Sequence, residues 1–441
     1  PGDLLTVEGT QEGSPAEGRF VKGEVIVGVN GNTLKGTNTV VVLGQAITRA
    51  EAGDGKLVFD VKSGKKAAGP LRQVAVKIPA LGAYGGTWPV DCGKSQKIVE
   101  QAENYYHQAV DAGADRGISG ALQCLFLLST GDDKHLPVVK KHYQKFIDTP
   151  KSIGDHTWNN GYNGIACAEY YLRTGDKDML PVLQAFCDDA RDRQKFGCGW
   201  IHWGPSVNPQ YVASGLMNPA GAQVLTTLLL CKEAGVNVDE KTLLGSLKFF
   251  WRFAGRGTVP YGDHRGEGGL GSNGKDGMIA AAMQVASGAS GNTAIYQSAR
   301  DCLSMSMLAS YPNMVTGHGD NGRGDGIWRG ISTAYLKDKK PADYRAMMDG
   351  IAWWFDLSRF HSGAMGMAMC KRFNDTGSGA AVALAQEPHV VGELLAPRAQ
   401  VGDVLVPRRR ISPNVVLHAS GAESLRQFHR PVPTGLARVV E

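Results

Sequence analysis

The sequence lacks any hydrophobic run long enough to cross a membrane. Its longest apolar stretches, such as 40–43 and 225–230, fall far short of the roughly 20 residues that a membrane-spanning helix needs. It also lacks a strong excess of one charge, because 47 basic and 42 acidic residues leave a net charge of only +5. We therefore expect neither a membrane span nor a nucleic-acid partner, which would require a concentrated basic surface.

Several catalytic motifs are missing as well. The eight cysteines include no C-x-x-C pair, which argues against a zinc ribbon and a thioredoxin-type redox site. No G-x-S-x-G nucleophile elbow and no phosphate-binding loop occur. Cys124, Cys167, Cys231 and Cys370 lie inside apolar helical segments, where cysteine serves as a small buried side chain. We predict that these four thiols pack in the core.

The first ninety residues are rich in glycine and β-branched residues, and their short apolar runs predict a small β-rich module. Asn30-Gly31 is a strong signal for a two-residue hairpin turn. One helix is expected over 39–49. The predicted strands cover 4–7, 24–29, 56–61 and 74–78.

Three stretches of this module, at 13–16, 21–26 and 29–31, resemble the GSPA…GDVI…VNG signature of PDZ domains in bacterial proteases and secretion factors. PDZ domains bind extended peptides by adding a strand to a sheet edge, so the resemblance implies a peptide or protein partner. Only residues 1–3 remain for the loop that would hold the peptide's carboxylate. The alternative is a PDZ-like scaffold that packs rigidly on its neighbour.

From Ser95 onward helical periodicity takes over, and one glycine-punctuated unit returns six times. Each unit joins a helix with a polar face to a more apolar helix. The polar-faced helices are expected at 95–110, 134–148, 177–194, 240–254, 292–309 and 341–358. The apolar helices are expected to begin near Gly117, Gly161, Pro219, Gly274, Gly326 and Gly363.

Glycine at the start of these helices suits close packing around a crowded axis, so we expect a closed ring instead of an open solenoid. The chain thus resembles the α/α-toroid superfamily of terpene cyclases, prenyltransferase subunits, polysaccharide lyases and glycosidases. Over about residues 2–386 it resembles a family of uncharacterised bacterial proteins. The expected fold class is α+β multidomain: a small β-rich PDZ-like domain (1–88), an (α/α)6 toroid of six helical hairpins (89–388) and an irregular or β C-terminal segment (389–441).

The loops before the apolar helices carry the candidate binding residues. In an α/α toroid these loops open on one side, so their polar side chains converge on a shared bowl. Aromatic rings beside Asn, Asp and His suit sugars, whose apolar faces stack while their hydroxyls form hydrogen bonds. The alternative is that these residues cap helix starts and bridge loops. The predicted substrate-binding residues are Trp158, Asn159, Asn160, Trp200, His202, Trp203, Tyr211, His318, Asp320 and Asp325.

The loop from Tyr261 to Glu267 is the predicted catalytic segment, because it holds a base, a cation and two carboxylates. Glycoside hydrolysis would use Asp263 or Glu267 as the proton donor of a carboxyl pair. Uronate β-elimination would use His264 or Tyr261 as the base and Arg265 to neutralise the uronate carboxylate. The sequence does not choose between these two reactions.

No cofactor is expected, although Asp263, His264, His202 and His318 could converge on a divalent metal. The acidic D-x-D-D run of terpene cyclases is missing. The chain opens at Pro1 without Met or signal peptide, so we expect a trimmed or processed form. The leading hypothesis is an exported, periplasmic or extracellular protein that binds a polysaccharide, with lyase or glycoside hydrolase activity as its chemistry. The alternative is a non-catalytic PDZ–toroid scaffold for a protein partner.

Overall fold

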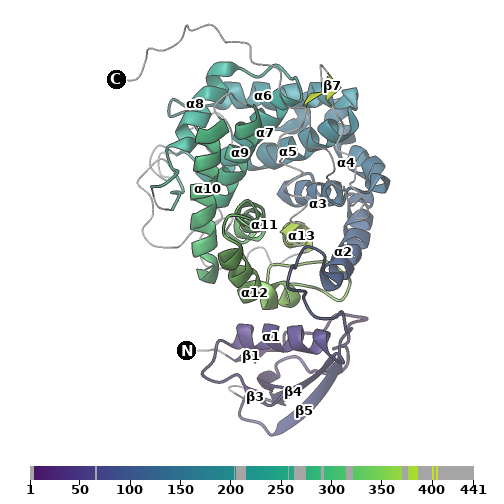
Figure 1. Cartoon of the computed structure of the whole chain (residues 1–441). Coiled ribbons are helices and arrows are strands. Elements are labelled where there is room, and N and C mark those ends of the chain that lie inside the picture. The colour runs from purple at the N-terminus through teal and green to yellow at the C-terminus, as the bar shows by residue number, and fades with distance from the viewer. Residues whose placement is uncertain are drawn as a thin grey trace, which may run out of the picture. The chain divides into compact units, whose positions relative to one another are not determined.

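The computed structural model describes residues 4–64, 67–202, 204, 215–256, 258–262, 275–289, 293–313, 321–369, 376–385, 400–401 and 404–405. Helices dominate the described residues, and the main sheet lies near the N-terminus (Figure 1). None of the described helices is long and apolar enough to span a membrane.

The N-terminal module is an antiparallel sheet with one helix. The strand order is β1-β2-β4-β5, and β3 pairs with β2. Asn30 and Gly31 have φ values of 50° and 77°, as a two-residue hairpin turn requires, and they join β2 to β3. All predicted strands and the predicted helix are present. The elements are β1 (Leu5–Thr6), β2 (Val25–Val29), β3 (Asn32–Thr33), α1 (Thr39–Ala52), β4 (Lys56–Lys62) and β5 (Leu71–Lys77).

The polar-faced helices form the outer layer of the helical part, and short 3-10 turns precede two of them. Their buried residues recur with helical spacing along one side, while the other side is exposed. The bounds are α2 (Gly93–Asp111), η2 (Asp133–His135), α4 (Leu136–Asp148), η3 (Pro150–Ile153), η4 (Lys177–Met179), α6 (Leu180–Arg193), α8 (Glu240–Trp251), α10 (Thr293–Ala309), η5 (Tyr311–Asn313) and α12 (Pro341–Leu357).

The apolar helices form the inner layer. Each packs on the next in sequence order, and the last, α13, packs back on the first, α3, which closes a ring (Figure 1). The predicted fold class, a small β-rich module followed by an α/α toroid, is therefore confirmed. The inner helices are α3 (Ile118–Ser129), α5 (Thr157–Thr174), α7 (Asn218–Glu233), α9 (Lys275–Ala289), α11 (Asn321–Ala334) and α13 (Thr376–Ala385).

Glycines let the inner helices approach closely. A Cβ on Gly161 of α5 would lie 3.2 Å from the backbone nitrogen of Val224 on α7. A Cβ on Gly277 of α9 would lie only 2.6 Å from the carbonyl oxygen of Trp328 on α11. Side chains at these positions would force the backbones apart, and the expectation of a closed ring rested on this same argument.

The predicted start of the last inner helix was wrong. Residues around Gly363 form a turn with a β-bridge between Arg359 and Met365, and α13 begins at Thr376. Gly363 has a φ of 88°, and a Cβ there would lie 2.6 Å from the carbonyl oxygen of Gln101. Gly363 therefore permits a turn that packs against α2, and it does not begin a helix.

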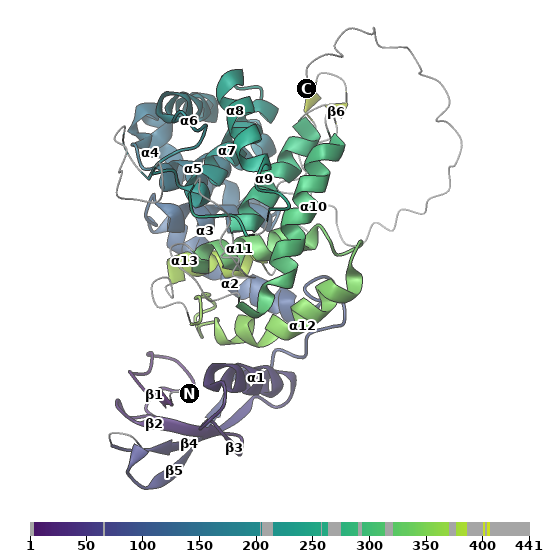
Figure 2. The same cartoon turned by 90° about the vertical axis from the view of Figure 1, so that its left-hand side faces the viewer.

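Buried charges join the N-terminal module to the ring. Lys94 Nζ lies 2.9 Å from Glu51 Oε2 on α1 and 2.7 Å from Asp356 Oδ2 on α12. Arg359 pairs with both carboxylates. The charges of the two carboxylates and the two basic side chains compensate each other, because an unpaired buried charge is strongly unfavourable. In agreement, α1 packs directly on α12 (Figure 2).

Three of the four predicted core cysteines are confirmed as fully buried: Cys124, Cys167 and Cys231 on α3, α5 and α7. Burial raises the pKa of the Cys124 and Cys167 thiols, and the hydrogen bond with Cys187 together with burial raises that of Cys231, so none is a nucleophile at neutral pH. Cys370 lies outside the described residues. Near the C-terminus the short strands β6 (Gln400–Val401) and β7 (Val404–Leu405) pair with each other. The proposed boundaries at 88 and 388 remain predictions.

Candidate functional site

The starts of the inner helices form a rim along one end of the ring. Asn159 Oδ1, in the first turn of α5, lies 3.5 Å from the place that a Cβ on Gly117 would take, just before α3. Gly161, two residues farther along α5, packs against Gln223 near the start of α7. The polar residues that precede these helices are therefore neighbours, as the toroid prediction required.

Backbone hydrogen bonds hold the loops along this rim. The Thr157 N–H at the start of α5 donates to the His202 carbonyl oxygen over 3.0 Å. The Met217 N–H, just before α7, donates to the Trp200 carbonyl oxygen over 2.8 Å. Asn218 holds the next loop, since its Nδ2 donates to the Pro260 carbonyl oxygen over 2.9 Å. The loop at 200–202 and the loop before α9 are thus fixed to the helix starts.

Trp158 and His202 meet at the start of α5. The indole Nε1–H donates to His202 Nδ1 over 3.1 Å. Because an indole nitrogen can only donate, His202 Nδ1 must be the accepting nitrogen, and the neutral ring carries its proton on Nε2. Trp158 is nearly buried, whereas His202 is half-buried. Trp158 therefore fixes the orientation and tautomer of His202.

His156 stands beside this pair as the N-cap of α5. Its Nδ1 accepts the Asn159 N–H over 3.4 Å, and its ring centroid lies 6.1 Å from that of His202. Burial lowers the pKa of His156, so the ring is neutral at pH 7 with its proton on Nε2. Two neutral imidazoles at the rim can thus donate hydrogen bonds through Nε2.

Two predicted binding residues support the rim from within. Trp200 is 1% exposed, and its Nε1–H donates to the Ala190 carbonyl oxygen over 2.8 Å. Asn160 is also buried, and its Nδ2 donates to Asp189 Oδ2 over 2.9 Å. Neither Trp200 nor Trp158 has a free face for a sugar ring in this conformation. The expectation that both stack on sugars is therefore corrected: they act as supports.

Tyr261 continues the rim beyond α7. Its carbonyl oxygen accepts the Asn218 N–H over 2.8 Å, and its ring is partly exposed. The buried ammonium of Lys275, at the start of α9, lies 5.5 Å from the centroid of this ring. Tyr261 therefore brings an aromatic face and a hydroxyl to the same rim as His202.

The axis of the ring is closed one turn inside the rim. Trp328 on α11 donates its Nε1–H to Tyr162 Oη on α5 over 3.1 Å, and both side chains are buried. The two helices stand opposite each other in the ring order, so their contact spans the lumen. The contact therefore closes the lumen at this level of the ring.

The other predicted site residues cannot be compared with the structure. His264, Asp263, Arg265, Glu267, Trp203, Tyr211, His318 and Asp320 lie outside the described residues, as does the side chain of Asp325. Their assignment, and the metal set that included three of them, stays a prediction.

Asp115 and Arg116 also reach this rim, although the sequence analysis did not single them out. Both are exposed, and Asp115 Oδ1 accepts the Gly117 N–H over 2.5 Å just before α3. Their position in the loop before the first inner helix was the signal that could have identified them. Asp115 adds a carboxylate to the described part of the rim.

A model of the family described as "Domain of unknown function (DUF6288)" matches residues 95–386. No curated protein matches the sequence. An inactive variant of the GH76A α-1,6-mannanase of Salegentibacter sp. HEL1_6, in complex with α-1,6-mannotriose, has a similar structure, with a TM-score of 0.50 and 15% identity over 67% of this chain and 99% of that chain. A second inactive variant of that enzyme, in complex with α-1,6-mannotetrose, gives a TM-score of 0.51 and 14% identity over 67% and 98%. At these identities the similarity shows the α/α-toroid fold alone.

Proposed function

The chain belongs to the family of the domain of unknown function DUF6288, and from that premise we propose that it binds an oligosaccharide at the mouth of its toroid. The observation that carries this proposal is the meeting of His156, Asn159, His202 and Tyr261 on one rim. The fold supports it, since it is shared with a mannanase whose solved complexes contain α-1,6-mannooligosaccharides.

Each rim residue has a role in sugar binding on this proposal. The Nε2–H groups of His156 and His202 donate to sugar hydroxyls, and the Asn159 amide both donates and accepts. Tyr261 offers an aromatic face for the apolar side of a sugar ring. Trp203, Tyr211, His318, Asp320 and Asp325 are proposed to complete the bowl.

Glycoside hydrolysis is the reaction we favour. It needs two carboxyl groups on either side of the scissile bond. Asp115 and Asp155, whose carbonyl oxygen accepts the Gly204 N–H over 3.1 Å, join the proposed Asp263 and Glu267 as candidates. Uronate elimination by His264 or Tyr261, with Arg265 at the carboxylate, is the competing reaction. The mannanase fold favours hydrolysis, and a polymeric substrate outside the cell implies export to the periplasm or medium.

The test is a calorimetric titration of the full chain with neutral and uronate oligosaccharides, followed by product analysis. Replacing His202 with Ala should weaken binding at least about tenfold, since a donor that faces the ligand is lost. Trp158→Phe keeps the aromatic volume but removes the N–H that orients His202, so it should weaken binding by a smaller factor. Trp251→Phe on the outer helix α8 is the matched control and should leave the affinity for the oligosaccharide unchanged.

The products separate the two reactions. A hydrolase leaves a new reducing end, whereas a lyase leaves an unsaturated sugar that absorbs ultraviolet light. If no oligosaccharide in a broad panel binds, or if His202→Ala binds as well as the parent, the carbohydrate proposal is wrong.

A second candidate function rests on a groove in the N-terminal module. A cavity of about 700 Å³ lies between β1 and α1, with Val7, Leu43 and Ile47 in its wall, and residues after α12 such as His361 close one end. We propose that the module is PDZ-like and that this groove takes an extended apolar peptide as an added strand. The proposal is supported if labelled peptides bind the parent protein and the Ile47→Glu variant no longer binds them. It is wrong if no peptide of a library binds.

A further inference from the structure

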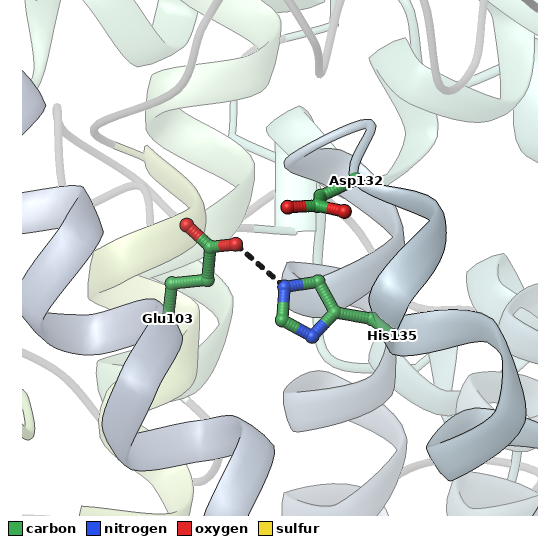
Figure 3. A group of neighbouring side chains, drawn as sticks. All are labelled: Glu103, Asp132 and His135. Atoms are coloured by element: carbon green, nitrogen blue, oxygen red, sulfur yellow. Dashed lines mark hydrogen bonds and ion pairs between the residues drawn. The ribbon is translucent and has the colours of Figure 1, made fainter.

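A second polar cluster lies at the opposite end of α3 from the rim. Glu103 and His107 come from α2, while Asp132 and His135 come from the turn and the η2 segment that follow α3. Figure 3 shows the carboxylates of Glu103 and Asp132 converging on the ring of His135. The oligosaccharide proposal makes no use of this cluster.

The cluster has the geometry of three metal ligands. His135 Nε2 lies 2.6 Å from Glu103 Oε1. One donor atom each from Glu103, Asp132 and His135 lie within 4.8 Å of one another. Ligands around a tetrahedral zinc stand about 3.3 Å apart, given zinc–ligand distances near 2.0 Å. A small withdrawal of the Glu103 side chain is enough to admit an ion.

The fold itself does not require this imidazole. The next repeat has the same turn, with Thr174-Gly175-Asp176 where this one has Thr130-Gly131-Asp132. Asp132 and Asp176 both cap the 3-10 turn that follows. Met179 occupies the place of His135, and both side chains are fully buried. An apolar side chain therefore suffices at this position, and a buried histidine needs another explanation.

A further histidine can set the tautomer of His135. His107 Nδ1 lies 2.8 Å from His135 Nδ1, so one of these nitrogens carries a proton and the other accepts it. At 2.6 Å His135 Nε2–H donates to Glu103 Oε1, so a bound ion would displace this proton. His135 Nδ1–H would then donate to His107 Nδ1 and leave the Nε2 lone pair for the ion. Metal-binding histidines are commonly oriented by such a second hydrogen bond.

We propose that Glu103, Asp132 and His135 bind a zinc ion, with water as the fourth ligand. An imidazole nitrogen with two carboxylates suits zinc, whereas magnesium and calcium prefer oxygen ligands throughout.

The ammonium of Lys134 lies where a metal ion would contact the two carboxylates. Its Nζ lies 2.6 Å from Glu103 Oε1 and 3.0 Å from Asp132 Oδ2, and its side chain is 51% exposed. Exposed ion pairs of this kind are weak, so the ammonium can swing into solvent when an ion enters. Lys134 therefore acts as a competitor for the metal.

The experiment titrates chelator-treated full chain with Zn²⁺ by calorimetry and with Co²⁺ by visible absorption. His135→Met, which copies Met179 of the next repeat, should reduce zinc affinity at least about 100-fold and abolish the cobalt spectrum. His107→Leu should reduce affinity about 10–100-fold, as loss of an orienting partner does. Lys134→Gln should raise affinity several-fold, because the competing charge is removed. Lys140→Gln, which removes the equivalent pair with Asp176 and Asp178, is the matched control and should have no effect.

Glu103→Gln is a second test in case the His135 variant does not fold. It preserves the shape of the side chain and should still abolish zinc binding. Thermal unfolding without metal should be similar for all folded variants. The proposal is overturned if the parent binds zinc no better than His135→Met, or if Lys134→Gln weakens binding. A purely structural ion network predicts the first of these results.

Discussion

His142 is a buried residue whose protonation state affects stability. Its ring is 5% exposed, and its Nε2 makes no hydrogen bond within the described part of the chain. Burial lowers the pKa of His142 to about 4, with a smaller contribution from the positive charge of Arg116. The folded protein therefore holds this ring neutral over a pH range in which the unfolded chain protonates it.

Stability should fall as the pH falls from about 6.5 to about 4. In this window His142 binds a proton in the unfolded state but not in the folded state, so the free energy of unfolding decreases as the pH falls. Between pH 7 and pH 5 the loss should be about 2 kcal/mol. Urea unfolding at the two pH values measures it, and His142→Leu should remove most of the difference. His361→Gln, at an exposed ring, is the control and should leave the pH dependence intact.

The tryptophans show the limit of sequence reasoning at this scale. The loop positions predicted aromatic and polar binding residues near the rim, but they could not tell which side chains are buried. Trp158 and Trp200 lie at or before the starts of inner helices, as a stacking residue would, yet both are buried. Burial of this kind depends on contacts such as that between Trp200 and Ala190, whose partners come from different elements.

At the scale of elements, close approach between inner helices is the feature that sets the ring. Gly277→Ala should lower the free energy of unfolding by about 1–3 kcal/mol, because the new methyl group would meet the Trp328 carbonyl oxygen at 2.6 Å. Gly93→Ala, at the start of α2 where a Cβ meets nothing within 4 Å, is the matched control. It should leave stability unchanged or raise it by less than about 1 kcal/mol. Equal effects of the two changes would contradict this account of the ring.

Glycine periodicity predicted most of the inner helices but misread the last. It located the starts of α3, α7 and α9 closely, and it set α5 and α11 a turn or so late. Around Gly363 the same residue type serves a turn with positive φ. A glycine that permits close helix packing and one that permits a left-handed backbone look alike in sequence, so only the contact with Gln101 separates them.

At the scale of the whole molecule, the buried charges of Lys94, Glu51, Asp356 and Arg359 join the module to the ring. Asp356 also accepts hydrogen bonds from the hydroxyls of Thr48 on α1, over 2.7 Å, and Tyr84, over 2.9 Å. These partners are far apart in sequence. The sequence could offer a rigidly packed module as an alternative, but it could not identify the residues that would hold it.

Asp356→Asn should loosen this junction. Removing one partner from a buried charge cluster leaves an uncompensated charge and costs about 3–5 kcal/mol. We expect a lower free energy of unfolding and faster proteolysis within 79–92, the segment that links the module to α2. Asp111→Asn breaks an exposed pair with Lys141 and should leave stability nearly unchanged. If proteolysis of the linking segment is the same in both variants, the cluster does not hold the module in place.

The central claim is that the toroid binds an oligosaccharide where its inner helices begin. The most direct measurement is a crystal structure of the full chain with the tightest-binding oligosaccharide from a panel that includes α-1,6-mannotriose. We predict a sugar at the rim within hydrogen-bonding distance of His202 Nε2 and Asn159, above the closed contact between Tyr162 and Trp328. A sugar bound elsewhere on the protein, or no binding across the panel, would contradict the claim.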